Sequence, residues 1–144
     1  MLLLSTCMVQ EGQPPTDEQR GELERALKTV VRDHVGPKAR LAVAWMTVPK
    51  GSAYSAGKPS KSSLVQVGVP DGFGQSAREA LMHDVNDRWC AITGQTRFEL
   101  LVGAMDQTPG RQAVKGILSQ IPLTQKPRFL KDYLTHAIRS LARG

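Results

Sequence analysis

Two stretches of this chain, Thr16-Asp17-Glu18-Gln19 and Ser76-Ala77-Arg78-Glu79, share one pattern: a hydroxyl residue followed three positions later by Gln or Glu. In such a capping box the hydroxyl and the later side chain satisfy free N–H groups at the start of a helix. Apolar residues then recur at helical spacing, and each run stops at a glycine, Gly36 or Gly94. We therefore predict two helices, each opened by its box and closed by a left-handed glycine cap.

Strand-like runs flank both predicted helices. They cover residues 2–9 and 40–48 in the first half, and 63–69 and 97–104 in the second. The pattern is two β-α-β units, which favour parallel pairing within each half and can share one four-stranded sheet with both helices on one face. We therefore predict an α+β fold. The opposite face of the sheet carries apolar residues, so we expect oligomerisation to cover it.

A helical extension is predicted after the second unit. We place the β-α-β-β-α-β domain at residues 1–108 and the extension at 109–144, with helices at about 112–120 and 128–142 separated by prolines. The second of these helices has an apolar stripe that should pack on the domain or on a neighbouring subunit. Its members are Leu130, Leu134, Ala137, Ile138 and Leu141.

The positive charge of the chain lies in this extension. From Arg111 onward there are seven Lys or Arg residues against one acid, Asp132, which equals the net charge of +6 for the whole chain. No nucleic-acid motif accompanies the charge, so we expect a solvated helix face and no nucleic-acid partner. The apolar start at Met1 is too short to span a membrane, and Cys7 and Cys90 fit buried free thiols in a reducing cytoplasm.

Motifs for cofactor or metal chemistry are missing from the sequence. It contains no P-loop, dinucleotide fingerprint, zinc-ligand spacing or nucleophile elbow, so we expect neither a cofactor nor a metal. The three histidines, His34, His83 and His136, all fall in predicted helices without a paired ligand four residues later. We interpret each as a surface or boundary residue of its helix.

The first half resembles the tautomerase superfamily, which includes 4-oxalocrotonate tautomerase, macrophage migration inhibitory factor and cis-3-chloroacrylic acid dehalogenase. The resemblance rests on the order of a strand from the first residue, Glu11-Gly12, the box at Thr16, the segment Lys38-Ala39-Arg40-Leu41-Ala42-Val43, and the segment from Lys50 to Pro59. It covers about residues 1–106 and implies a homotrimer of subunits with two β-α-β units each.

The resemblance also implies a site. The family uses an N-terminal proline as its proton-transfer group, but Leu2 stands where that proline should be, so the terminus here is a primary amine on Met1. Arg40 matches an arginine that binds the substrate carboxylate, a task suited to a planar charged fork. Met1 and Arg40 are thus the predicted catalytic residues, and an anionic small molecule would contact Leu2, Arg40, Tyr54 and Gln75.

Three hypotheses follow for function. The first is an isomerase-type enzyme that catalyses enol–keto proton transfer on an oxo-acid without the proline base. The second is a non-catalytic module that binds a ligand or a protein. The third is an unrelated ferredoxin-like dimer that shares only the two β-α-β units. For Arg40 itself, the alternative to substrate binding is an ion pair with a helix acid such as Glu24.

Overall fold

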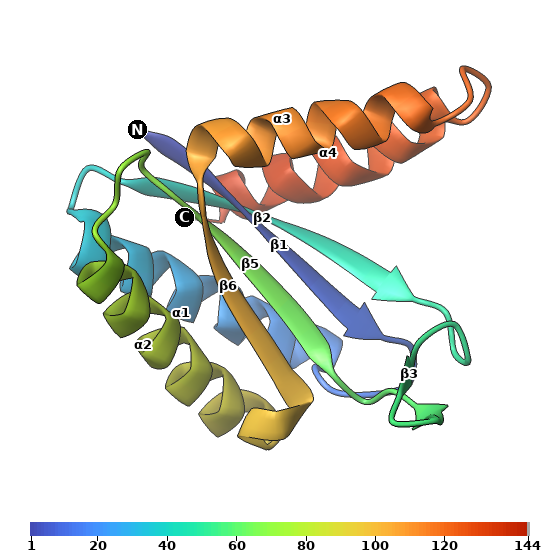
Figure 1. Cartoon of the computed structure of the whole chain (residues 1–144), viewed down its shortest axis with the longest axis horizontal. Coiled ribbons are helices and arrows are strands. Elements are labelled where there is room, and N and C mark those ends of the chain that lie inside the picture. The colour runs from blue at the N-terminus through green and yellow to red at the C-terminus, as the bar shows by residue number, and fades with distance from the viewer. Residues whose placement is uncertain (144) are drawn as a thin grey trace.

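A four-stranded sheet in the order β2-β1-β5-β6 forms the centre of the computed structural model (Figure 1). Its strands are β1 (Leu2–Gln10), β2 (Arg40–Val48), β5 (Ser63–Val69) and β6 (Leu100–Asp106). The structure describes residues 1–143, without the side chains at 114, 117 and 129; Gly144, the last residue of the predicted extension, lies outside the described residues.

The strand pairing confirms the two β-α-β units. β1 pairs parallel with β2, β5 pairs parallel with β6, and the two halves meet where β1 runs antiparallel to β5. Crossover helices α1 (Asp17–Val35) and α2 (Gln75–Thr93) lie together on one face of the sheet (Figure 1). This is the α+β architecture expected from the sequence.

The two helices begin differently. At α1 the predicted box forms: the Gln19 N–H donates to Thr16 Oγ1 over 3.2 Å, and the Thr16 N–H donates to Gln19 Oε1 over 2.9 Å. At α2 the predicted box is wrong, because Gly74 is the N-cap and no side chain caps the helix there. Ser76 already lies inside the first turn, where its hydroxyl is past the position that reaches the free N–H groups.

The glycine ends of the helices also differ. Gly94 closes α2 in the left-handed conformation, with φ 73° and ψ 4°, as predicted. Gly36 closes α1 with φ 139° and ψ 158°, so its predicted left-handed cap is wrong, although its positive φ still favours glycine.

The segment before β6 is shorter as a strand than expected. Residues 97–99 were predicted to be extended, but they form a 3₁₀ turn that brings the chain to Leu100. Between β2 and β5, a small hairpin pairs β3 (Tyr54–Ser55) with β4 (Lys58–Pro59). Its two turn residues, Ala56 and Gly57, have φ of 50° and 75°, the conformation that two-residue hairpin loops require.

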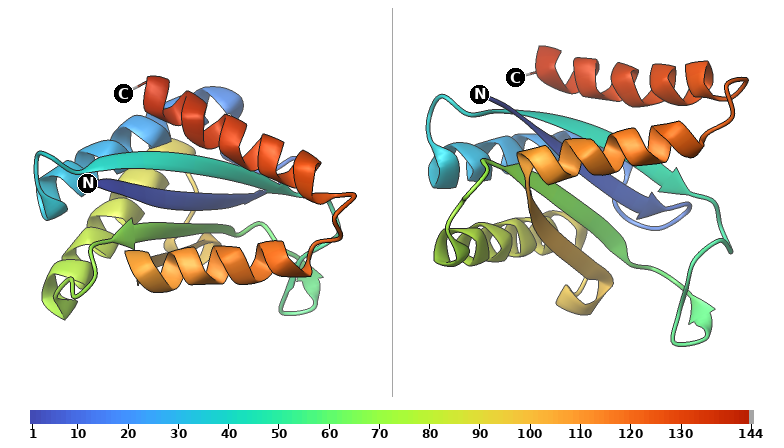
Figure 2. Two further views of the ribbon diagram at one scale, coloured as in Figure 1. Left: turned by 90° about the horizontal axis from the view of Figure 1, so that it is seen from above. Right: turned by 45° about the horizontal axis from the view of Figure 1, so that its top comes forward.

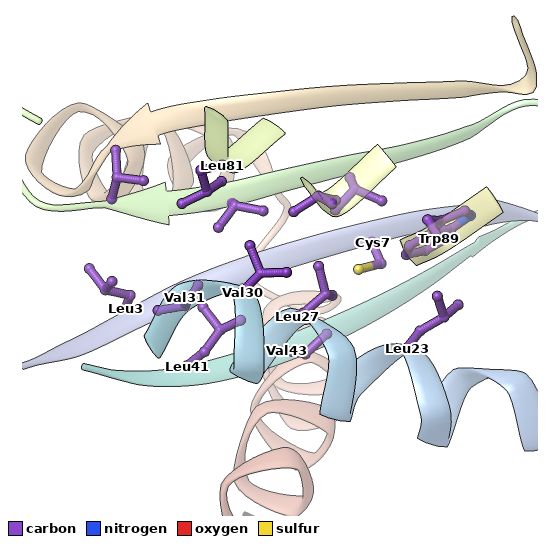
Figure 3. Close-up of a cluster of buried hydrophobic side chains, with 14 of the residues drawn as sticks. Leu3, Cys7, Leu23, Leu27, Val30, Val31, Leu41, Val43, Leu81 and Trp89 are labelled. Carbon is purple, nitrogen blue, oxygen red and sulfur yellow. The ribbon is translucent and has the colours of Figure 1, made fainter. Parts of the chain in front are cut away.

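The core lies between the sheet and helices α1 and α2 (Figure 3). Alternate residues of β1, Leu3, Cys7 and Val9, are fully buried in it, and two tryptophans close one end. Trp45 and Trp89 stand with ring centroids 5.9 Å apart. Both are therefore core residues.

The extension forms α3 (Gln107–Gln120) and α4 (Lys126–Ala142), on the side of the sheet away from α1 and α2 (Figure 2). α4 packs along β2, where the Val43 N–H donates to Ser140 Oγ over 3.0 Å and Ala137 is buried. The predicted stripe is only partly right, because Leu134 and Ile138 stay 49% and 63% exposed.

The second face of the sheet is therefore not bare over its whole width. α4 lies against β2, the edge strand, and α3 starts beside β6, where the Gln107 Nε2 donates to the Leu2 carbonyl over 2.9 Å. Apolar residues remain exposed on this face, including Leu2 at 47% and Leu101 at 65%. The chain's own extension thus covers part of the face that oligomerisation was expected to cover.

Candidate functional site

The predicted proton-transfer residue lies at the end of the sheet where β1 begins. The Met1 α-amine is 3.5 Å from the Lys38 carbonyl, and the Arg40 N–H donates to the Met1 carbonyl over 2.9 Å. In the parallel register Leu2 stands opposite Arg40. The fold thus brings together three of the predicted site residues, Met1, Leu2 and Arg40, which the chain separates by almost forty positions.

Arg40 is an exposed cation that is free to meet a ligand. Within residues 1–143 its guanidinium makes no ion pair, and Glu24, the partner considered for it, instead accepts a hydrogen bond from Trp45 Nε1 over 2.9 Å. The alternative of an Arg40–Glu24 pair is therefore wrong. Arg40 lines a cavity of about 440 Å³ between α1, the start of β2 and the end of α4.

Tyr54 lies far from this end of the sheet. It sits in the hairpin beyond the end of β2, with 64% of its surface exposed. The nine residues of β2 separate Tyr54 from Arg40, a strand length of about 26 Å at roughly 3.3 Å per residue. One subunit alone does not bring Tyr54 to Arg40, so a shared site would need Tyr54 from another copy.

Gln75 lies near the end of the sheet where β1 begins, but its side chain already makes a hydrogen bond. It is the first residue of α2, which follows β5, and β5 ends where the antiparallel β1 begins. Its Nε2 donates to Glu79 Oε1 over 3.0 Å on the surface of the same helix. A ligand contact by Gln75 would have to replace that bond.

Arg78 is a polar residue of this region that the sequence analysis did not single out. Its guanidinium donates to the carbonyls of Phe73 and Ala104, each over 2.9 Å, and to Asp106 Oδ1 over 2.6 Å. It thereby ties the start of α2 to the end of β6, a positioning role. The available signal was a cation in the first turn of a helix, where the dipole disfavours positive charge unless a partner compensates it.

The described residues form no metal-binding cluster, and Cys7 is not a reactive thiol. Among the described residues, no three His, Cys, Asp or Glu side chains come together in a way that could hold a metal ion. Burial raises the pKa of the Cys7 thiol to about 12, so it is protonated and unreactive at neutral pH. No helix within residues 1–143 is long and apolar enough to cross a bilayer.

Solved structures with the same architecture are known. A member of the cis-3-chloroacrylic acid dehalogenase (cis-CaaD) family has a TM-score of 0.65 and 13% identity, covering 87% of this chain and 96% of its own. A fused 4-OT symmetric trimer has a TM-score of 0.60 and 20% identity, over 72% of this chain and 84% of its own. Leishmania major MIF2 has a TM-score of 0.62 and 14% identity, covering 73% of this chain and 88% of its own.

The chain has the tautomerase-superfamily fold. Comparisons of the sequence with family models and with curated proteins give no match. The resemblance read from the first half of the sequence is thus confirmed at the level of this fold. The tautomerase-superfamily fold explains why the start of β1 and the start of β2 lie side by side, since the parallel pairing of these strands places Met1 beside Arg40.

Proposed function

We propose that this protein is an isomerase-type enzyme that moves a proton between the enol and keto forms of an oxo-acid. Arg40 binds the carboxylate of the substrate, and the neutral Met1 amine, or a water next to it, transfers the proton. The enol oxygen loses a proton and the adjacent carbon gains one, so the reaction consumes no cofactor. The cytoplasm suits this protein, since Cys7 and Cys90 are free cysteines.

The observation that carries the proposal is the pairing of Met1 with Arg40 across β1 and β2. The backbone bond from Arg40 to Met1 fixes the two residues side by side, and Arg40 has no carboxylate partner within residues 1–143 that would compete with an anion. An unpaired guanidinium on a residue whose backbone is hydrogen-bonded to Met1 fits an anionic substrate that must also exchange a proton.

We further propose that the active assembly is a homotrimer. One of the structures that this chain is similar to is a fused 4-OT symmetric trimer. The position of Tyr54, at the far end of β2 from Arg40, supports a site that two subunits complete. In that assembly Leu2, Arg40 and Gln75 of one subunit and Tyr54 of another would surround the substrate.

Introducing the missing proline tests the proposal. Leu2→Pro should allow removal of Met1 and expose a secondary amine, so we expect phenylpyruvate enol–keto tautomerase activity to rise above that of the wild type. Arg40→Ala on this background should lower the activity by about 10- to 100-fold, the effect of losing one charged hydrogen bond. Arg128→Ala, an exposed change on α4, is the matched control and should have little effect.

The opposite result would select the other hypothesis. If the processed Leu2→Pro protein is folded, with the loss of Met1 confirmed by mass, but shows no activity above buffer with a panel of oxo-acids, the protein is a non-catalytic binding module. One observation favours that second function: Met1 is 58% exposed, so the protein encloses its amine only partly, whereas enzymes usually exclude water from the reacting groups.

A further inference from the structure

The cavity of about 440 Å³ that Arg40 lines extends between α1 and the end of α4. Three separate parts of the chain enclose it: one face of α1, the segment that leads into β2, and the last turn of α4. Five of its lining residues are cations, and none is an acid. The lining residues are Arg25, Lys28, Thr29, Arg32, Pro37, Ala39, Arg40, Leu41, Leu141 and Arg143.

These five cations have no carboxylate partner within the part of the chain that the structure describes. The ion pairs there involve Arg20, His34, Arg78 and Arg88 instead. Glu24, whose charge acts on Lys28, is buried and accepts the hydrogen bond from Trp45 Nε1. The described lining therefore gathers five cations that make no ion pair.

Lys28 links the two helices that border the cavity. Its ammonium group donates to the Ser140 carbonyl of α4, and burial lowers its pKa. The charge of Glu24 raises the pKa, and that of Arg143 lowers it by less. Lys28 therefore holds α4 against α1 at the edge of the cavity.

The negative ends of the helix dipoles do not neutralise all five cations. The last turns of α1 and α4 both reach the cavity, and each helix C-terminus carries roughly half a unit of negative partial charge. The two ends together offset about one of the cations. An excess of about four positive charges is left around a single small cavity, which is a strong field for an anion.

The rest of the lining limits what that anion is. Leu41, Leu141, Ala39 and Pro37 provide apolar surface beside the cations, and a volume of about 440 Å³ suits a small organic molecule. The lining contains no aromatic side chain, so bases of a single-stranded nucleic acid would have nothing to stack on. Four arginines favour planar, paired recognition of oxygens, as in phosphate binding.

We propose that this cavity binds a small organic phosphate that carries at least two negative charges. The phosphate oxygens lie between Arg32 of α1 and Arg143 of α4, and the organic part lies on Leu41 and Leu141. Because the ligand joins α1 to α4, it also stabilises the docking of the extension. The proposed phosphate lies at the α1–α4 side of this cavity, and Arg40 stands between it and the proposed proton-transfer site at Met1.

Calorimetric titration with inorganic pyrophosphate tests the site in the full-length protein. In about 150 mM salt, where exposed charges are largely screened, we expect a dissociation constant below about 1 mM. The double variant Arg32→Gln/Arg143→Gln should weaken binding at least about 10-fold, since each change removes a charged hydrogen bond. Arg40 is left unchanged, so the proposed tautomerase activity should persist in this variant.

The control is Arg128→Gln/Lys131→Gln, which also removes two positive charges, but from exposed positions of α4 outside the cavity. It should alter pyrophosphate binding less than about twofold. Equal weakening by both pairs would overturn the proposal, since net charge alone would then explain the affinity. Failure of the wild type to bind pyrophosphate would also overturn it, and tighter binding of citrate than of pyrophosphate would replace the phosphate by a polycarboxylate. Circular dichroism confirms that each variant is folded.

Discussion

At the scale of single residues, Glu24 is the least expected feature of the core. Its side chain is 5% exposed, and its Oε1 accepts the bond from Trp45 Nε1 while its Oε2 has no hydrogen-bond partner. The Arg20 guanidinium lies 5.3 Å from the centre of the Trp45 ring. Burying a carboxylate costs free energy unless hydrogen bonds compensate for the lost water. The single bond from Trp45 offsets part of this cost, and through it Glu24 fixes the orientation of the indole.

We predict that Glu24→Ala destabilises the protein by about 1–3 kcal/mol, because Trp45 Nε1 would lose its acceptor in a buried position. Glu24→Gln should be milder, since an amide oxygen can still accept the bond. Urea denaturation followed by tryptophan fluorescence measures both. The exposed Glu22→Ala is the control and should change stability by less than about 0.5 kcal/mol; an equal loss in Glu22→Ala would contradict the role of Glu24.

At the scale of elements, charged side chains join the two helices. Asp84 of α2 binds Arg88 Nε over 2.7 Å and His34 of α1 over 3.0 Å, and Arg88 also reaches Asp33 over 3.6 Å. His34 is thus a partly exposed boundary residue, as expected from the sequence. This network lies above the apolar contact between α1 and α2.

The network predicts a loss of stability in acid. The hydrogen bond from Arg88 lowers the pKa of Asp84 below its ordinary value of 3.8, and the bond with His34 adds to this. The folded state therefore favours the carboxylate. Its contribution is complete above pH 3.8 and is lost as pH falls through the lower folded pKa. Thermal melts from pH 5 to 2 should fall more steeply for the wild type than for Asp84→Asn, whereas the exposed Asp87→Asn should follow the wild type.

The buried hydroxyl of Ser140 joins α4 to β2. Ser140 Oγ satisfies the Val43 N–H at the edge of the sheet, where no further strand is available to accept it. We predict that Ser140→Ala lowers the free energy of unfolding by about 1–3 kcal/mol. Hydrogen exchange should show faster exchange of the Val43 amide in this variant. Ser119→Ala on α3, which is exposed, should leave both quantities unchanged; unaltered Val43 exchange in Ser140→Ala would contradict the prediction.

At the scale of the whole molecule, the extension lies on the face of the sheet where we expect self-association. α4 covers β2 and α3 starts over β6, while Leu2 and Leu101 remain exposed. A trimer built on this face has to accommodate both helices. The extension therefore controls how much of the face a neighbouring subunit can use.

We predict that the full chain sediments as a trimer at micromolar concentration, and that deletion of residues 109–144 lowers the melting temperature. The deletion removes the partner of the Val43 N–H and exposes the β2 edge, which favours aggregation. Sedimentation velocity and thermal melts measure both. A stable monomer would contradict the trimer, and a truncated protein with unchanged melting temperature would show that the extension is a free interaction arm.

The sequence by itself determined the two β-α-β units. Period-two strands, helical spacing and the box at Thr16 are local signals, and short-range geometry makes them readable without tertiary contacts. It also indicated Arg40, because the resemblance placed that residue at the start of β2. The second box, at Ser76, gave a wrong helix start, since the helix is capped by Gly74 two residues earlier, which no side-chain pattern indicates.

Only the tertiary structure decided how α4 packs on the sheet and which basic residues come together. Ala137 is buried as a member of the predicted apolar stripe of α4, but Leu134 and Ile138 are not. The helix packs through Ala137 and Ser140, because small side chains let it approach the edge of β2 closely. That approach brings Arg143 next to Arg32 and Lys28 across the fold. Such convergence depends on contacts between residues more than one hundred positions apart, which local sequence patterns do not encode.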